Sequence, residues 1–569
     1  MEEWIIKRKG GDFEKIANRF HISPRIASLI RNKNIIEMSD IQMYLEGSIS
    51  DLNDPMFLKD IDKALDILTE KIDQGKKIRV IGDYDIDGIN ATYILLTGIR
   101  RLGGNVDSDI PDRMKDGYGI NEELIERAYH DGVDTVITCD NGIAAKEAID
   151  YGKNLGMTII VTDHHEVPYE MEDGERTYIL PAADGIVNPK QEDCNYPFKD
   201  LCGAGIAYKL IEALCEIRGK DVDEMDDLLE NAAIATVGDV MDLVGENRIL
   251  VKEGLARIRK TKNIGLNALI EATNLTKESI GTYHIGFVLG PVMNASGRLS
   301  TAKKALELLE ITDEREGKLL AEELKALNDS RKEMTEQGVK KGVESLGESP
   351  EAKVLVLYLK DCHESIAGIV AGRIKEAYHH PVIVLTDGKD GLKGSGRSIE
   401  AYDMYEGINE CKDLLTKYGG HKMAAGLSLP KENLEEFTAR INRNARLSPD
   451  DFKKVIRIDM ELPFSAVSER FIYELSLLEP FGKGNEKPVF ALRGVEIIKG
   501  DIIGKNQNVL KGIIKDGKGD KIDFISFQNV EELQEKSKGN KMNITYYPQV
   551  NEYNGYKTLQ IVITNYRIV

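Results

Sequence analysis

The chain has 569 residues, a formal net charge of -20 and a hydrophobic content of 41%. Its length predicts several domains, because a domain commonly spans about 100–200 residues. Its acidic balance argues against a generally basic nucleic-acid-binding surface, while leaving room for a local basic channel. The sequence shows no Cys-x-x-Cys pair, no signal peptide and no window of ~20 apolar residues, which predicts a soluble cytoplasmic protein with reduced thiols and no membrane span.

Residues 1–60 are predicted to form a small helical appendage. Apolar residues recur there at helical spacing around Ser23-Pro24, namely Phe13, Ile16, Ala17, Phe20, Ile26, Ala27 and Ile30. The outline is similar to a helix-turn-helix, but packing of these helices is favoured over DNA recognition by this segment.

An alternation of strands and helices begins near residue 61. A buried strand over residues 77–81 ends at Asp83, Asp85 and Asp87, and a helix is predicted over residues 89–101. Carboxylates at the carboxyl end of a strand lie where open α/β sheets bind ligands. Because close-set carboxylates repel one another, a hard divalent cation is expected between them. Taken alone, the run fits a solvent-facing acidic turn equally well.

Two further strands end in residues of the same kind. Residues 135–139 lead to Asp140, and residues 157–162 lead to Asp163-His164-His165. Parallel strands joined by helices bring their carboxyl ends to one edge of a sheet, so these side chains are expected to meet. Asp239 follows in a small and apolar helix, where a carboxylate is rare without a partner. The pattern therefore favours a metal site.

The next segments predict a second lobe. Residues 314–346 are highly charged with leucines at helical spacing, which predicts a connecting helix between two lobes. A second α/β unit follows, with two glycine-rich turns predicted over residues 393–398 and 419–422. Glycine lets backbone N–H groups approach a phosphate, and Ser395, Arg397 and His421 add side-chain donors. Phosphate binding is favoured there over a plain hairpin turn.

From about residue 454 onward the sequence consists of short apolar runs separated by glycine, asparagine and lysine turns. Examples are residues 489–492, 523–527, 543–547 and 559–563. Such a series suits a small barrel such as an OB-fold. Its aromatic residues are candidates to stack bases and its lysines to follow phosphates, although most of the aromatics are predicted to lie in the core.

Together these motifs resemble the DHH phosphoesterase superfamily and, within it, the RecJ family of single-stranded-DNA-specific exonucleases. The matching motifs are Gly82-Asp83-Tyr84-Asp85-Ile86-Asp87-Gly88, Ile110-Pro111-Asp112-Arg113 with Asp116-Gly117-Tyr118-Gly119, Thr138-Cys139-Asp140-Asn141-Gly142, Asp163-His164-His165, Gly238-Asp239-Val240, Gly290-Pro291 with Asn294-Ala295-Ser296-Gly297-Arg298, Gly394-Ser395-Gly396-Arg397-Ser398, Gly419-Gly420-His421 and Glu479-Pro480-Phe481-Gly482-Lys483-Gly484-Asn485. Two positions depart from the family pattern. Ile86 stands where alanine or valine is usual, and Ser365 replaces the glycine of a His-Glu-Gly motif, so a close backbone approach is not expected at that turn.

The resemblance implies an α/β fold with a two-lobed DHH phosphoesterase core and a C-terminal OB-fold β-barrel. In the core, a parallel-sheet DHH domain and a DHH-associated α/β domain are joined by a long helix. The predicted domains are the helical appendage (1–60), the DHH catalytic domain (61–250), a helical region with the connecting helix (251–350), the DHH-associated substrate-binding domain (351–453) and the OB-fold nucleic-acid-binding domain (454–569).

The same resemblance implies an enzyme that hydrolyses single-stranded DNA from the 5′ end by a two-metal mechanism. It would release 5′-mononucleotides and act in DNA repair and recombination. The implied cofactors are two divalent cations, Mn²⁺ or Mg²⁺, held by Asp85, Asp87, Asp140, His164 and Asp239. Asp140 is expected to bridge the two metals and His165 to orient their ligands, and Asp83 is the uncertain member of the set.

Substrate-binding residues are carried over from the family in the same way. The implied grip on the 5′ phosphate comes from Arg113, Ser395 and Arg397. The implied nucleotide path is lined by Asn294, Arg298, His363 and His421. The expected partners are single-stranded DNA, a single-strand-binding protein and a helicase, and the chain is expected to be a monomer without membrane attachment.

Two alternative functions stay open, one within the superfamily and one from another functional class. One is an oligoribonuclease or cyclic-dinucleotide phosphodiesterase of the same superfamily, although such enzymes usually lack a C-terminal barrel. The other is a non-catalytic DNA-binding scaffold, which would be expected to have lost metal ligands that this sequence retains.

Overall fold

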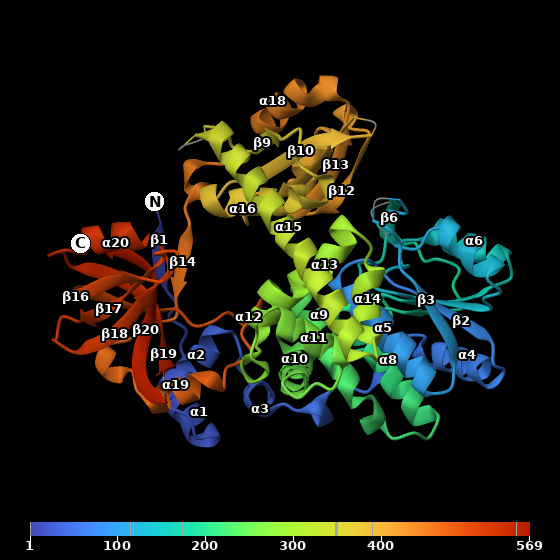
Figure 1. Ribbon diagram of the computed structural model, residues 1–569, viewed down its shortest axis with the longest axis horizontal. Coiled ribbons are helices and arrows are strands. Elements are labelled where there is room, and N and C mark those ends of the chain that lie inside the picture. The colour runs from blue at the N-terminus through green and yellow to red at the C-terminus, as the bar shows by residue number, and fades with distance from the viewer. Residues whose placement is uncertain are drawn as a thin grey trace. The chain divides into compact units, whose positions relative to one another are not determined.

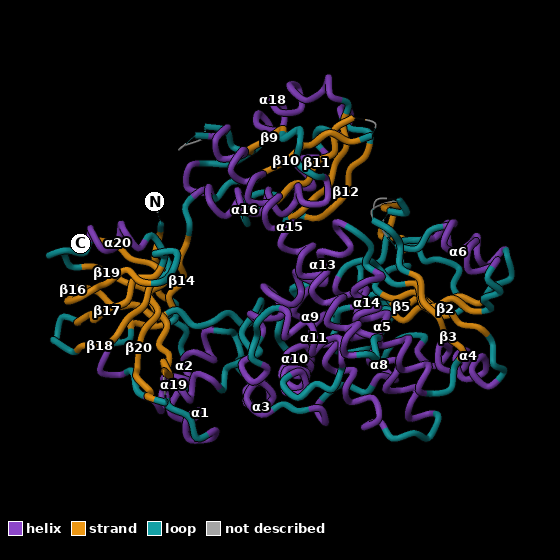
Figure 2. Tube along the Cα trace, in the orientation of Figure 1, coloured by secondary structure: helices purple, strands orange, loops and turns teal. Residues whose placement is uncertain are grey.

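The computed structural model describes residues 2–113, 115–117, 119–172, 175–347, 351–389, 391–553 and 555–569. Tyr118 of the quoted motifs lies outside these residues. The chain divides into two compact units, whose helices and strands are labelled in Figure 1 and coloured by type in Figure 2. Unit 1 comprises Asp54–Asp239 and Gly254–Lys454, and unit 2 comprises Glu2–Asn53, Val240–Glu253 and Val455–Val569.

The first sheet of unit 1 is parallel throughout, with the strand order β3-β2-β4-β5-β8. Its strands are β2 (Lys77–Ile81), β3 (Asn105–Asp109), β4 (Thr135–Cys139), β5 (Thr158–Thr162) and β8 (Gly185–Val187), and its helices are α4 (Ile61–Asp73), α5 (Ile86–Arg101), α6 (Glu122–His130), α7 (Lys146–Asn154) and α8 (Gly203–Ile217). The inner strands are almost wholly buried because helices cover a parallel sheet on both faces. The carboxyl ends of β2, β4 and β5 therefore meet at one edge, as predicted.

Strand β3 is not predicted by the sequence pattern, because Asn-Val-Asp-Ser-Asp contains no apolar run. It forms one edge of the sheet, where polar side chains are tolerated. A short antiparallel pair, β6 (Tyr169–Glu172) and β7 (Glu175–Tyr178), follows β5 in the chain and forms a separate two-stranded sheet. Strand β3 is parallel to β2, so the chain that leads to Arg113 leaves the sheet at the same end as the chain that leads to Asp83. This places Arg113 on the same side of the sheet as the carboxylates.

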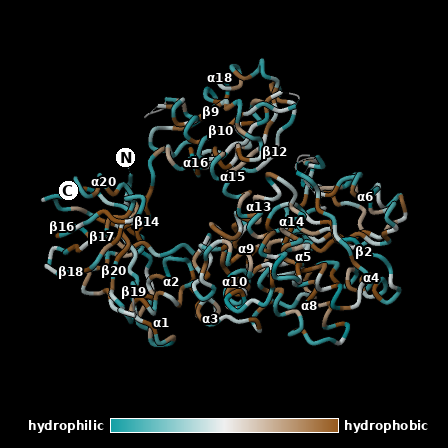
Figure 3. The backbone as a smooth tube through the Cα atoms, in the orientation of Figure 1, coloured by the Kyte–Doolittle hydropathy of each residue, from teal (hydrophilic) through white to brown (hydrophobic). Residues whose placement is uncertain are grey.

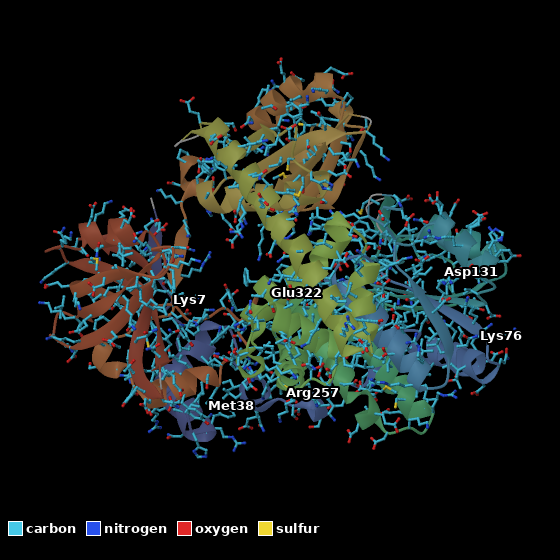
Figure 4. The ribbon with its side chains drawn as sticks, viewed as in Figure 1. Lys7, Met38, Lys76, Asp131, Arg257 and Glu322 are labelled. Atoms are coloured by element: carbon cyan, nitrogen blue, oxygen red, sulfur yellow. The ribbon has the colours of Figure 1, made fainter. Side chains whose placement is uncertain are left out.

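Arg79 is a buried cation that ties β2 to its surroundings. Its guanidinium donates to both carboxylate oxygens of Asp107 at 2.7 Å and to Asp131, labelled in Figure 4, at 2.8 Å. We expect Arg79→Met to lower the free energy of unfolding by about 2 kcal/mol, because it removes a buried cation that is shared by two carboxylates and leaves Asp107 with Lys77, at 3.1 Å, as its cation. Urea denaturation measures the change, and Asp131→Asn should show a smaller one. An unchanged midpoint for Arg79→Met would contradict this role.

A helical region leads from the first sheet to the second. It contains α9 (Leu229–Gly238), α10 (Gly245–Ile258), α11 (Ile264–Ala272), α12 (Thr282–His284), the π-helical turn η5 (Ile285–Leu289), α13 (Gly290–Leu299), α14 (Lys303–Glu310) and α15 (Glu314–Leu346). Helix α15 packs against α11, α13 and α14 toward its start and against α16 farther on. It is the predicted connecting helix, with the predicted bounds.

The second sheet of unit 1 has the order β12-β13-β11-β10-β9, in which β9 and β10 are parallel and the other pairs antiparallel. Its strands are β9 (Leu355–Tyr358), β10 (Val382–Gly388), β11 (Gly391–Arg397), β12 (Lys417–His421) and β13 (Ala424–Leu429), and its helices are α16 (Ala367–Tyr378), α17 (Met404–Asn409) and α18 (Leu434–Asn444). The prediction of glycine-rich turns was wrong, since both segments are strands. A Cβ at Gly394 would lie 2.5 Å from a methyl group of Leu385, so glycine admits core side chains against the strand.

Unit 2 contains a closed barrel, which confirms the predicted OB-like domain. Strands β16 (Phe490–Ile503), β17 (Val509–Lys515), β18 (Lys521–Ser526), β20 (Tyr556–Ile568) and β19 (Met542–Tyr553) follow one another in that order, and β19 pairs again with β16. The other helices and strands of the unit are β1 (Glu3–Ile6), α1 (Phe13–Phe20), α2 (Pro24–Asn32), α3 (Met38–Glu46), β14 (Val455–Ile458), β15 (Met460–Glu461), α19 (Glu469–Ser476), α20 (Val530–Lys536) and the part of α10 up to Glu253.

The N-terminal segment is built into unit 2 and does not form a separate appendage. It opens with β1, which pairs in parallel with β14. Ile26 and Ile30 of α2 are fully buried in the same core as Phe490 and Phe524 of the barrel. The apolar helical pattern near Ser23-Pro24 is therefore a packing face, as favoured over DNA recognition.

Hydrophobic residues gather along the sheets and the inner helices, whereas hydrophilic residues dominate the outer loops (Figure 3). Among the described residues, no helix combines the length and the apolar character needed to cross a lipid bilayer.

Candidate metal centre and phosphate pocket

Asp85 and Asp87 are held at the start of α5 by backbone N–H groups. Asp85 is the N-cap residue, and its Oδ1 accepts from the N–H groups of Asp87 at 2.9 Å and Gly88 at 3.2 Å. Asp87 is fully buried, and its two oxygens accept from Gly203 and Ala204 at 2.6 and 2.7 Å. Those N–H groups begin α8, whose positive end stabilises a buried carboxylate.

His164 lies where three carboxylates meet. Its Nε2 is 3.1 Å from Asp140 Oδ1, 3.6 Å from Asp87 Oδ2 and 3.9 Å from Asp239 Oδ2. The donor atoms of Asp87, His164 and Asp239 lie within 4.8 Å of one another, as do those of Asp140, His164 and His165. The structure therefore brings together residues from the ends of β2, β4, β5 and α9.

Asp140 is common to two groups of donors. Besides its group with the histidines, it forms a second one with Asp83 and Asp85, again within 4.8 Å. Its backbone has φ 59°, in the left-handed region that aspartate adopts more readily than most residues. A buried carboxylate shared by two donor groups is what two neighbouring cations require between them.

Asp83 belongs to this donor set, although its role was uncertain from the sequence. The residue is fully buried, and neither carboxylate oxygen has a hydrogen-bond partner of ordinary geometry among the described residues. Burial, followed by the charge of Asp85, raises the pKa of Asp83 to about 8, although the N–H groups of Tyr84 and Gly119 and the charge of His165 act in the opposite direction. A bound cation would relieve such a carboxylate.

The pKa shifts of the other predicted ligands also favour a bound cation. Burial raises the pKa of Asp87, and burial together with the charges of Asp87 and Asp85 raises the pKa of Asp140 well above its ordinary range. Burial lowers the pKa of His164 and so favours the neutral imidazole, the form that binds metals. Carboxylate oxygens with an imidazole nitrogen fit Mn²⁺ well and Mg²⁺ acceptably.

Asp163 orients His165, a role that the sequence pattern did not reveal. Its Oδ1 accepts from the N–H groups of His164 at 2.7 Å and His165 at 3.1 Å, and lies 2.7 Å from His165 Nδ1. Its Oδ2 accepts from the N–H group of Ile143 at 2.9 Å. Although burial lowers the pKa of His165, the hydrogen bond to Asp163 raises it to about 9.

We therefore expect Asp163→Asn to lower the pKa of His165 below about 9 in metal-free protein, because the carboxylate that favours the imidazolium is gone. In the wild type this pair stabilises the folded state below the ordinary histidine pKa of 6.5, and the contribution is lost as the pH rises through about 9. Histidine NMR titration in EDTA measures the shift. An unchanged pKa would show that Asp163 does not set it.

A pocket of about 480 Å³ opens beside Tyr84, whose neighbours in sequence are Asp83 and Asp85. Its lining includes Tyr84, Arg113, Arg298, Ser365, Gly368, Lys393, Ser395, Arg397, Lys417, Tyr418 and Ser428. Four of the predicted substrate-binding residues are thus brought together, namely Arg113, Arg298, Ser395 and Arg397. Asn294, His363 and His421 are not part of this lining.

The pocket concentrates positive charge. Burial, and then repulsion by Arg113 and Arg331, lowers the pKa of Arg298 to about 10. Burial and Arg113 also lower the pKa of Arg397, whose Nη1 donates to Ser395 Oγ at 3.1 Å. Because these arginines repel one another, an anion bound between them would be stabilised.

Gly368 is a pocket residue that the sequence did not identify. It lies in the first turn of α16, and a Cβ there would lie 2.6 Å from Arg397 Nη2 and 2.7 Å from Ser395 Oγ. Only glycine leaves this cradle open, and the cradle lies at the positive end of the helix dipole of α16, which favours anions. The position of this glycine shortly after His363-Glu364 was the feature of the sequence that could have identified it as a pocket residue.

The three predicted residues outside the lining have different surroundings. His363 Nδ1 lies 2.7 Å from Ser365 Oγ, and Arg298 Nη1 donates to the Ser365 carbonyl at 2.7 Å, so this turn is closely approached despite the serine. Asn294 precedes Arg298 by one turn of α13, and His421 ends β12 with its side chain exposed.

Family models match three segments of the chain. The DHH family N-terminal domain matches residues 77–236, the DHHA1 domain residues 351–446 and the RecJ OB domain residues 458–565. The chain is 34% identical to single-stranded-DNA-specific exonuclease RecJ of Bacillus subtilis, covering 98% of this chain and 70% of that protein. It is 33% identical to RecJ of Escherichia coli, covering 92% of each. The chain belongs to the RecJ family.

Solved RecJ structures share its architecture. RecJ of Thermus thermophilus in complex with Mn²⁺ matches with a TM-score of 0.83 and 29% identity, covering 99% of this chain and 79% of that one. The complex with Mg²⁺ gives 0.78 at the same identity, covering 99% and 78%. The predicted RecJ fold class, a two-lobed DHH core with an OB barrel, is confirmed, as is the predicted class of cofactor.

Proposed function

We propose that this RecJ-family chain is a metal-dependent phosphodiesterase that degrades single-stranded DNA from its 5′ end and releases 5′-mononucleotides. The observation that carries the proposal is the position of Tyr84. In the sequence, Tyr84 lies between Asp83 and Asp85 of the metal centre. Its side chain lines the cationic pocket, and the Arg113 guanidinium lies 5.1 Å from its ring centroid. A carboxylate–imidazole centre and an anion pocket are therefore immediate neighbours in unit 1.

The proposed metal ligands are Asp85, Asp87, Asp140, His164 and Asp239, with Asp83 as an added donor. Two bound Mn²⁺ or Mg²⁺ ions would supply an activated water and stabilise the attacking and leaving oxygens of an in-line displacement. Asp140 would hold negative charge between the two donor groups. His165, fixed by Asp163, would act as a positioning residue for the ligands.

The pocket would account for degradation from the 5′ end by holding the terminal 5′ phosphate at a fixed place beside the metal centre. Arg113, Ser395 and Arg397 would bind the terminal phosphate, with Arg397 offering a planar fork of donors that suits phosphate oxygens. Holding that end fixes which phosphodiester bond meets the metal centre. Asn294, Arg298, His363 and His421 would line the nucleotide path, and the barrel of unit 2 would bind the strand.

Family membership supports further proposals about the cellular setting. These are a monomeric chain acting in DNA repair and recombination, together with a single-strand-binding protein and a helicase. The predicted cytoplasmic location and the predicted boundaries of the domains after the N-terminal segment stay predictions.

One panel tests the proposed activity. Single-stranded DNA labelled at either end, duplex DNA, a dinucleotide and a cyclic dinucleotide are each incubated with Mn²⁺ or Mg²⁺. The expected result is mononucleotide release from single strands, beginning at the 5′ end. Preferred hydrolysis of the dinucleotide or cyclic dinucleotide would instead support the small-substrate alternative, and no hydrolysis of any substrate would support the scaffold.

A further inference from the structure

Two aromatic side chains stack on each other at the surface of unit 1. Tyr283 is 65% exposed and Phe287 is 70% exposed. Their ring centroids are 5.0 Å apart and their planes make an angle of 26°. Aromatic side chains gain most from burial, so a stacked pair held in solvent presents a flat apolar surface to a ligand.

The pair lies on an irregular part of a continuous helix. Tyr283 is in α12 and Phe287 in the π-helical turn η5, and α13 continues the same helix to Leu299. Turns of π-helix are rare and occur frequently at functional sites, because the extra residue re-aims the side chains around it. Here the turn coincides with the exposed ring of Phe287.

The helix lies against the backbone that carries the metal-centre carboxylates. Its glycines make the closest approaches, with an added Cβ lying 3.7 Å from Val237 at Gly286, 3.0 Å from Ile86 at Gly290 and 2.5 Å from the Tyr84 carbonyl at Gly297. Tyr84 and Ile86 alternate with the three aspartates of the opening motif. The helix therefore runs alongside the proposed reaction centre.

The exposed rings continue a stripe of residues already proposed to face DNA. Asn294 and Arg298 are four positions apart in α13, which places them on one side of that helix, and Phe287 comes seven positions before Asn294, within the π-helical turn. Arg298 lines the phosphate pocket, and Asn294 Oδ1 is buried without a hydrogen-bond partner in the described part of the chain. At about 1.5 Å per residue, Phe287 lies roughly 16 Å along the helix from Arg298. That distance corresponds to a few nucleotides, since each rises about 3.4 Å in a stacked strand.

A cation stands beside the start of the helix. Arg259 is exposed, and its Nε donates to the carbonyl of Ile280 at 3.0 Å, just before Tyr283. Surfaces that hold single strands combine rings on which bases stack with cations that meet phosphates. The charge and the aromatic surface therefore point to the same kind of ligand.

We propose that Tyr283 and Phe287 form a base-stacking platform for the part of a single DNA strand that has not yet reached the metal centre. The proposal rests on the proposed exonuclease function. With the 5′ phosphate at the Arg298 end of the stripe, the strand passes the centre and its following bases reach the rings. Stacking tolerates every base, which suits an enzyme that must advance through any sequence.

The test combines a binding and a cleavage measurement on full-length protein carrying both Tyr283→Ala and Phe287→Ala. Fluorescence anisotropy in EDTA gives the Kd for a 5′-phosphorylated single strand of about 12 nucleotides, which we expect to rise on the order of tenfold. Hydrolysis of a 5′-phosphorylated dinucleotide with Mn²⁺, which is too short to reach the rings, should stay at the wild-type rate.

Two controls separate stacking from a structural effect. Exchange of the rings, Tyr283→Phe with Phe287→Tyr, should keep the wild-type Kd, and so should Leu319→Ala, which removes an apolar side chain that is 68% exposed on α15. An unchanged Kd for the double alanine variant would overturn the platform, even if a protein partner bound the surface. Equal losses on the long strand and the dinucleotide would also overturn it. A wild type that cleaves neither substrate would refute the proposed function instead.

Discussion

Asp140→Asn is expected to lower turnover of single-stranded DNA on the order of 10³-fold while leaving the fold intact. The amide keeps the size of the side chain and tolerates the left-handed backbone at φ 59°. It removes, however, the negative charge shared by the two donor groups, so neither metal position would be properly filled. A nuclease assay with Mn²⁺ and far-UV circular dichroism measure the two parts of this expectation.

The same substitution should change thermal stability in opposite ways with and without metal. Burial and neighbouring carboxylates raise the pKa of Asp140, so the stability linked to its protonation is present at low pH and lost as the pH rises through that pKa. In EDTA at neutral pH the Asp140→Asn variant should therefore melt higher than the wild type. Mn²⁺ should stabilise the wild type more than the variant, because ligand binding stabilises only a competent folded state. Near-normal turnover, or equal stabilisation by Mn²⁺, would contradict the assignment.

Arg397→Ala is expected to reduce the preference for 5′-phosphorylated over 5′-hydroxyl strands by roughly 10- to 100-fold. This range follows from the loss of a charge-assisted hydrogen bond worth about 1.5–3 kcal/mol. The guanidinium lies in the cradle left open by Gly368 and donates to Ser395 Oγ at 3.1 Å, so its removal empties the centre of the pocket. Competition between differently labelled strands with the two end groups measures the preference.

Two further variants sharpen that experiment. Arg397→Lys keeps the charge without the planar fork and should restore only part of the preference. Arg440→Ala removes an arginine on α18 that pairs with Asp413 on the surface, and should leave the preference unchanged. If the wild type used phosphorylated and hydroxyl ends equally, the pocket would not be an end-recognition site.

Most of the fold could be predicted because local signals agreed with the final structure. Helix α15 has the predicted bounds, and β2 and β4 were marked by apolar runs bounded by turns. The failures have a common cause in tertiary context. Strand β3 is polar because it lies at an edge, and the glycine-rich β11 and β12 look like turns until their neighbours are known.

The metal centre was more predictable than the pocket. Residues that follow parallel strands must meet at one sheet edge, so the proximity of Asp87 and Asp140 to His164 follows from topology. The inclusion of Asp83 depends instead on complete burial, and that of Gly368 on the approach of Arg397 from another element. Neither property is encoded in local spacing.

The length of helix α15 sets the distance between the phosphate-binding residues of the second sheet and the metal centre of the first sheet. It is one uninterrupted helix of 33 residues, and the two sheets of unit 1 lie on either side of it in the chain. Inserting one residue into such a spacer would turn everything beyond it by about 100° and advance it by about 1.5 Å. Inserting seven would restore the orientation to within about 20° while lengthening the span by about 10 Å. Insertions of seven residues into this helix should therefore be tolerated better than insertions of one residue. A longer helix would increase the distance between the end-binding residues and the metal centre, and with it the length of the released product.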